Sequence, residues 1–159
     1  MKKYLFKTTW LTIISVILLI FNGCSDDSNE PQSPISSNMV CTNWGASKAE
    51  VMKHMKKFEM KIMDNDFICY NGKNNIQTIS YQFQNDELHA SLILIPQDNT
   101  SLSEIQSSFS KYEYIGEKNG IEIYVSEKTN TMATIALSVK GGTSYYAVGY
   151  TVLDIDTSY

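Results

Sequence analysis

Histidines, cysteines and closely spaced carboxylates are the residues of this chain whose types and spacing could support catalysis or metal binding. A nucleophilic triad needs a histidine beside a serine or cysteine, and the chain has two histidines, His54 and His89. Nothing near either histidine suggests a partner that would orient it as a base, so we interpret both as surface or boundary residues. Zinc is not indicated, because Cys41, Cys69 and the histidines lack close ligand spacing. We therefore predict no catalytic residue, no metal site, no cofactor and no enzyme activity.

Calcium is the remaining metal to consider, because carboxylates are closely spaced in two places, Asp64–Asn65–Asp66 and Asp154–Ile155–Asp156. Neither is followed by the glycine and distal glutamate of an EF-hand loop. The first is typical of a turn, in which Asp and Asn bond to the local backbone. The second falls in a tail that we expect to be frayed.

The N-terminal residues have the pattern of an export signal. Residues 1–7 carry three lysines, Trp10 to Phe21 is a mostly apolar run, and Asn22-Gly23-Cys24 follows at once. The apolar run is shorter than the roughly 20 residues that a bilayer span needs, which favours a secretory signal. The stretch from Leu19 to Cys24 resembles a bacterial lipobox, although Phe21 stands where leucine is usual. This resemblance implies that residues 1–23 are removed and that Cys24 is acylated with palmitate-type chains.

Ser25-Asp26-Asp27, directly after this cysteine, resembles the short export signal of Bacteroidetes surface lipoproteins. The resemblance implies an outer-membrane lipoprotein that faces outward, held by its acyl chains. Residues 24–38 are almost without apolar side chains and cannot offset the entropy cost of ordering. We predict that they form a flexible tether and that one folded domain spans 39–159.

Cys41 and Cys69 remain once Cys24 is acylated, and two cysteines in an exported domain can form a disulfide. Cys41 precedes the first expected helix and we expect Cys69 to point inward beneath it, so a bond is geometrically plausible. The alternative is a buried free Cys69 and an unrelated Cys41. Sequence leaves both alternatives open, because it does not give the Cα separation.

Composition excludes one class of partner. The chain has 159 residues, of which 43% are apolar and 19% charged, as in globular domains. It has 13 basic residues, all lysine, and 17 acidic ones. Loss of residues 1–23 would leave ten lysines against the same 17 acids, a formal charge of −7. An acidic chain without arginine is poorly suited to bind nucleic acid, so we expect none as a partner.

An internal similarity predicts the architecture. Residues 47–96 align without a gap with residues 101–150, at an offset of 54; identities are few, but eleven pairs of positions keep their apolar character. Ser47 and Glu50 form a capping box, and Ser101 and Glu104 form another; each precedes a helical apolar stripe. We expect the helices to end near Lys57 and Lys111. Alternating segments and turn residues then predict eight strands, at 59–63, 67–71, 76–84, 88–95, 113–117, 121–127, 132–139 and 144–152.

These elements predict an α+β fold of two tandem α-β-β-β-β repeats, spanning about 44–96 and 98–153, with antiparallel sheet(s) and helices packed on one face. We expect the helices to cover the face that carries the following apolar residues: Phe67, Cys69, Ile79, Tyr81, Phe83, Leu92, Leu94, Ile121, Ile123, Val125, Ile135, Leu137 and Val148. The layout resembles the tandem-repeat fold of the beta-lactamase-inhibitor protein, which binds a protein on its concave sheet face. It is also distantly similar to small outer-membrane lipoproteins of the barrel-assembly type. Neither resemblance assigns a functional residue.

The sheet face away from the helices is the predicted binding surface. Alternation places Tyr70 and Tyr124 there, with Tyr145, Gln82 and Thr134 among the residues beside them. Tyrosines on a polar face are typical of protein or glycan binding, since tyrosine brings contact area at low entropy cost. The alternative is that they are cross-strand pairs that only stabilise the sheet.

The function that we expect is that of a surface lipoprotein whose domain is a non-catalytic binding module for a protein or glycan. The alternative is an accessory structural lipoprotein of an envelope assembly. An enzyme is the least supported interpretation.

Overall fold

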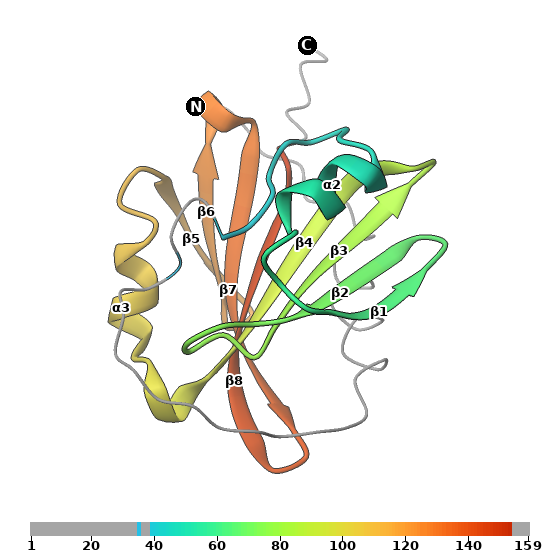
Figure 1. Ribbon diagram of the computed structural model, residues 1–159. Coiled ribbons are helices and arrows are strands. Elements are labelled where there is room, and N and C mark those ends of the chain that lie inside the picture. Colours follow the sequence, from blue (N-terminus) through green and yellow to red (C-terminus); the bar gives the residue numbers. More distant parts are fainter. Residues whose placement is uncertain (1–34, 36–38, 154–159) are drawn as a thin grey trace. The chain divides into compact units, whose positions relative to one another are not determined.

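The chain forms one antiparallel sheet of eight strands (Figure 1). The computed structural model describes Ile35 and residues 39–153. The strands lie in the order β1-β2-β3-β4-β8-β7-β6-β5, so β4 and β8 pair in the middle and β1 and β5 are the edges. The strands are β1 (Met60–Asp64), β2 (Phe67–Asn71), β3 (Thr78–Gln84), β4 (Glu87–Pro96), β5 (Glu113–Lys118), β6 (Ile121–Ser126), β7 (Thr131–Lys140) and β8 (Thr143–Val152).

All eight predicted strands are confirmed, each to within two residues at either end. The hairpin turns explain this accuracy. Asn85-Asp86, Asn119-Gly120 and Gly141-Gly142 each have two successive positive φ angles, from +54° to +81°. Two-residue hairpin loops of type I′ need this conformation, which Asn, Asp and Gly adopt most readily.

Two short helices accompany the sheet within the described residues. These are α2 (Lys48–His54) and α3 (Leu102–Ser107), and both predicted capping boxes are present at their N-termini. Both helices end earlier than the predicted ends at Lys57 and Lys111. Two single turns of 3-10 helix, η1 (Gln97–Asn99) and η2 (Glu127–Thr129), complete the elements.

The predicted fold class is wrong. The structure is mainly β, a single eight-stranded antiparallel sheet with two helices of 7 and 6 residues, and not an α+β fold of two tandem repeats with helices packed on one face. Each helix buries a single side chain of its own, Val51 in α2 and Ile105 in α3. Apolar stripes this short cannot stabilise long helices, whose stability comes mostly from tertiary packing. The strands therefore supply most of the core.

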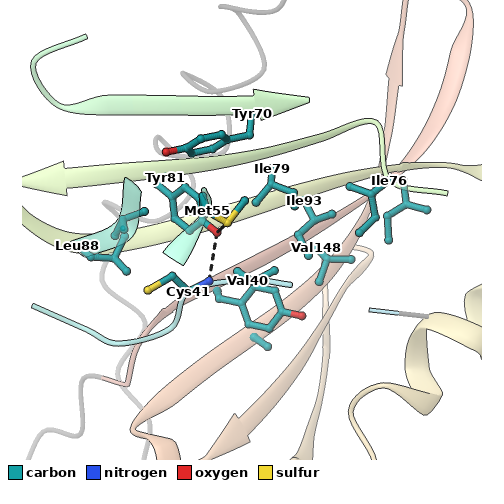
Figure 2. Packing of buried hydrophobic residues seen from close by; sticks show 14 of the residues in the cluster. Val40, Cys41, Met55, Tyr70, Ile76, Ile79, Tyr81, Leu88, Ile93 and Val148 are labelled. Atoms are coloured by element: carbon teal, nitrogen blue, oxygen red, sulfur yellow. Dashed lines mark hydrogen bonds between the residues drawn. The ribbon is translucent and has the colours of Figure 1, made fainter. Parts of the chain in front are cut away.

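The main hydrophobic cluster lies on one face of the sheet, which we call the core face (Figure 2). Tyr81 is central to it: its side chain is fully buried, its hydroxyl accepts a hydrogen bond from the Cys41 N–H at 3.1 Å, and it lies 3.1 Å from the Met55 sulfur. The residues that sheet strands contribute to the core face are Ile68, Tyr70, Ile79, Tyr81, Phe83, Leu88, Ile93, Ile95, Tyr124, Ala133, Ile135, Val148 and Tyr150.

The other side of the sheet, which we call the second face, is also buried. Its buried side chains lie outside the main cluster and include Phe67, Cys69, Leu92, Leu94, Ile123, Val125 and Ala147. We expected six of these on the core face, and that prediction is wrong. Leu137, also expected inside, is 68% exposed. The reason is that four successive residues of β2, Phe67 to Tyr70, are all buried, so polarity does not tell which alternate set faces the helices.

Candidate functional site

The two tyrosines at the centre of the predicted binding surface are on the core face. Tyr70 is 2% exposed and its ring meets Tyr81 edge-on, with centroids 6.1 Å apart. Tyr124 is 7% exposed and stacks on Phe109 at 4.9 Å. Burial, and then the Glu122 carboxylate that accepts its hydroxyl hydrogen at 2.7 Å, raise the pKa of Tyr124. Their predicted position on the open face is wrong, and both rings stabilise the core instead.

The other three predicted residues lie on the second face, but not as an open surface. Thr134 and Tyr145 are buried, and Gln82 is partly buried. Within the described residues, the Gln82 Oε1 and Thr134 Oγ1 atoms are buried without a hydrogen-bond partner. Gln82 is on β3 and Thr134 is on β7, with β4 and β8 between them. The five predicted residues therefore do not form one site.

The cysteines do not pair. Cys41 and Cys69 are both buried and free. Cys41 belongs to the main cluster beside Tyr81, whereas Cys69 lies on the second face, so the sheet separates them. Burial raises the pKa of the Cys69 thiol to about 11, against the lowering influence of Lys61 and Lys140, and burial also raises that of Cys41. Of the two alternatives that the sequence left open, the structure has the one in which Cys41 and Cys69 are not bonded. Cys24, the predicted lipidation site, lies outside the described residues.

The histidines and carboxylates lie apart. His54 is exposed on α2, and His89 is half-buried on β4. Across Ile35 and residues 39–153, no group of three His, Cys, Asp or Glu side chains is placed to hold a metal ion. The Asp64 carboxylate accepts the N–H of Asn65 at 2.7 Å, which is local turn chemistry. The pair Asp154 and Asp156 lies outside the described residues.

A hollow of about 430 Å³ at one end of the sheet is a candidate site in the part of the chain that the structure describes. Its polar and aromatic lining consists of Trp44, Gln84, Asn85, Glu87 and His89, and we call it the Trp44 hollow. Gly45, Leu88 and Val152 also line it. These residues come from the segment before α2, from the turn between β3 and β4, and from the end of β8.

Hydrogen bonds fix Trp44 in this hollow. Its indole N–H donates to the Thr131 hydroxyl at 3.0 Å, and that hydroxyl donates to the Thr129 carbonyl at 2.9 Å. The next residue, Gly45, donates its N–H to the Leu88 carbonyl at 3.1 Å. Gly45 has a φ of +81°, which side-chain-bearing residues rarely adopt. Trp44 is therefore held against the sheet before any ligand arrives.

A β-bulge places His89 at the hollow. In the ladder between β3 and β4, Gln82 pairs with Ala90 but Phe83 pairs with Leu88, so His89 is the extra residue. Bulges bend a strand and change the direction of a side chain, and they are common beside functional sites. Beyond the bulge, the Asn85-Asp86 turn brings Gln84 and Glu87 together as the last pair of the hairpin. The turn and the bulge thus group an amide, a carboxylate and an imidazole.

The lining offers groups that could bind a small ligand. It offers donors and acceptors on Gln84, Asn85, Glu87 and His89, and an aromatic surface on Trp44. The described lining contains no serine, threonine or cysteine that His89 could activate as a nucleophile. Hollows that combine apolar surface with a few polar groups are the usual form of small-ligand sites.

No sequence motif marks this site. Its residues come from three separate segments, and none matches a spacing motif. The one available signal was Trp44, a large aromatic residue in a polar stretch next to a capping box.

Comparisons with known proteins do not add to this picture, since no family model, curated protein or solved structure matches the chain. In the part of the chain that the structure describes, no helix is long and apolar enough to span a membrane. Any function must therefore be argued from the residues themselves.

Proposed function

We propose that this protein is an outer-membrane lipoprotein whose domain is a non-catalytic binding module, with the ligand taken in the Trp44 hollow. The lipobox-like sequence that ends at Cys24 supports the anchor. The observation that supports binding is the hollow itself, in which a fixed indole ring lies next to amide, carboxylate and imidazole groups. A rigid aromatic residue beside adaptable polar groups is a frequent composition of ligand sites.

The anchor is tested by metabolic labelling with an alkynyl palmitate analogue in cells that produce the full chain. We expect label on the wild-type chain and on a Cys41→Ala control, and none on Cys24→Ala. Label that persists on Cys24→Ala would contradict acylation at this position. Protease treatment of intact cells then measures whether the domain faces outward.

Binding is tested with envelope material, because the ligand class is open between protein and glycan. The lipoprotein, immobilised in a sugar-free detergent, is exposed to solubilised envelope fractions, some treated with protease and some with periodate. We expect retention to fall in the variant Gln84→Ala/Glu87→Ala. We expect it to be unchanged in Glu117→Ala, an exposed carboxylate on edge strand β5. Equal retention by both variants would contradict the site.

A second candidate function, that of a structural member of an envelope assembly, has its own support. The β7–β8 hairpin carries Leu137 and Val139, which are 68% and 73% exposed. Partner strand β6 begins at Ile121, opposite Ala136, so these two residues lie beyond it on the hairpin that extends past the sheet (Figure 1). Exposed aliphatic side chains on a protruding hairpin favour contact with another protein. Co-purification of a stable complex that Leu137→Ser/Val139→Ser disrupts would support this function.

A further inference from the structure

We infer that the ligand of the Trp44 hollow is a neutral saccharide, with a pyranose ring stacked on Trp44 and its hydroxyls bound by Gln84, Asn85, Glu87 and His89. This inference rests on the proposed binding function and names its ligand class. Four properties of the hollow support it: its size, the aromatic surface of Trp44, the polar side chains of the lining and the charge of that lining.

Size limits the ligand to a small one. A volume of about 430 Å³ lies toward the lower end of the range of roughly 300–1,000 Å³ that small-molecule sites span. A mono- or disaccharide fits such a space, whereas a folded protein surface would contact only its rim. The hollow also lies at a sheet end between a turn and a strand terminus, where the end of a longer glycan can enter.

The aromatic surface is suited to a sugar ring. A pyranose presents an apolar face of C–H groups and an equatorial belt of hydroxyls, so it needs a flat apolar partner and polar neighbours at the edge. The indole N–H of Trp44 is already bonded to Thr131, and the ring is partly buried against the main cluster, so a ligand would contact the part of the ring that lines the hollow. Leu88 and Val152 extend the apolar part of the lining.

The polar groups of the lining are of the kind that bind hydroxyls. A sugar hydroxyl both donates and accepts, and the amides of Gln84 and Asn85 and the imidazole of His89 do the same. The Glu87 carboxylate accepts only, and it can receive two hydroxyl hydrogens from neighbouring carbons. Gln84, Asn85 and Glu87 are exposed, so each can reach a ligand without unburying another group.

The charge of the lining excludes an anionic sugar. Glu87 is the carboxylate of the described lining, and no lysine lies among those residues to offset it. A uronate or sialic-type carboxylate would be repelled there, whereas a neutral sugar gains a charge-assisted hydrogen bond.

The test uses the full lipoprotein in a sugar-free zwitterionic detergent and a defined set of probes. The probes are neutral methyl pyranosides of the gluco, manno and galacto series, their N-acetylamino forms, glucuronate, and the acyclic polyol glucitol. Isothermal calorimetry measures affinity, and the indole N–H resonance of Trp44 reports contact at the ring. We expect saturable binding of at least one neutral pyranoside at millimolar concentration, weaker binding of glucuronate, and none of glucitol.

Variants assign the binding to this hollow. Gln84→Ala and Glu87→Ala should each weaken binding of the responding pyranoside by roughly tenfold, as for a lost hydrogen bond in the bound state. Trp44→Leu should abolish it, with circular dichroism to confirm that the sheet is intact. Glu117→Ala should bind like the wild type.

Three outcomes would overturn the inference: no pyranoside binds, glucuronate or glucitol binds as well as the pyranosides, or the Gln84 and Glu87 variants bind like the wild type. The proposed function is tested separately. If sugars fail but envelope protein is retained through Gln84 and Glu87, the saccharide inference falls and the binding module stands. If neither sugars nor envelope fractions bind, both proposals fall.

Discussion

At the scale of single residues, Tyr81 links the segment before α2 to the sheet. It is the largest of the fully buried side chains. Its hydroxyl bonds both the Cys41 N–H and the Met55 sulfur (Figure 2). The spacing of Ile79, Tyr81 and Phe83 predicted that this residue points inward, and this is confirmed. Cys41, which donates to its hydroxyl, lies 40 residues away in the chain, and no sequence pattern predicts this pairing.

Replacing this hydroxyl tests its role. Tyr81→Phe leaves the buried Cys41 N–H without an acceptor, and we expect a loss of about 1–3 kcal/mol in the free energy of unfolding. Urea denaturation followed by circular dichroism measures it. Tyr114→Phe, at a ring that is 54% exposed, is the matched control and should cost less than about 0.5 kcal/mol. Equal effects of the two changes would contradict the role of the buried bond.

The Cys69 thiol predicts a pH dependence. Its pKa is raised from 9.0 to about 11 because burial disfavours the thiolate. The folded state therefore holds the proton more tightly than the unfolded state. The stabilisation is complete below about pH 9 and is lost as the pH rises toward 11.

We expect the wild type to lose roughly 1–2 kcal/mol more stability than Cys69→Ala between about pH 8 and pH 10.5. Comparing the two chains cancels the contribution of the buried tyrosines, which titrate in both. Urea denaturation at the two pH values measures the difference. Parallel losses in the two chains would show that the thiol does not titrate differently on folding.

At the scale of elements, the sequence predicted the positions of the strands well and the directions of their side chains poorly. Eight strands and two capping boxes are where hydrophobic alternation and turn residues placed them. The direction of alternate side chains was wrong in β2, where Cys69 was expected inward and Tyr70 outward. A strand that is buried on both sides has no polar set to mark the outside, so its orientation depends on neighbours in the sheet.

Strand β7 provides a prediction at this scale. Ile135, Leu137 and Val139 alternate on one face, but Ile135 is 3% exposed while the other two extend beyond β6. We expect Ile135→Ala to cost about 2–5 kcal/mol. Leu137→Ser/Val139→Ser should change the free energy of unfolding by less than about 0.5 kcal/mol.

Chemical denaturation of the three chains checks this contrast. A large loss in the double variant would mean that the hairpin is covered by other parts of the same chain, and it would weaken the case for a partner surface there. A small loss in Ile135→Ala would contradict its place in the core.

At the scale of the whole molecule, the segment before α2 closes the core and builds the Trp44 hollow. Val40, Cys41 and Ala46 are 5–7% exposed, and Ala46 accepts the Leu88 N–H at 2.8 Å. This segment has no helix or strand pattern, and the only residue in it with an expected role was Cys41, as a possible disulfide partner. Its hydrogen bonds to the sheet come from residues 40 or more positions away, such as Tyr81, Leu88 and Thr131.

Truncation tests this role. A chain that begins at Ser47 should be less stable than one that begins at Met39 by roughly 3 kcal/mol or more, because it loses buried apolar area and the bonds to Tyr81, Leu88 and Thr131. Urea denaturation of the two chains gives the difference. Equal stability would mean that these contacts do not stabilise the fold. It would also contradict the rigid placement of Trp44 in the hollow.

The sequence by itself determined where the strands, turns and helix caps lie, because these depend on local periodicity and on residues that favour particular φ angles. It also indicated an export signal with Cys24 at its end, since that pattern is contiguous. The tertiary structure decided the single eight-stranded sheet, the burial of Tyr70 and Tyr124, the separation of Cys41 from Cys69, and the hollow at Trp44. Each of these depends on which distant segments share a face of the sheet. Local residue types do not encode that choice when both faces are buried.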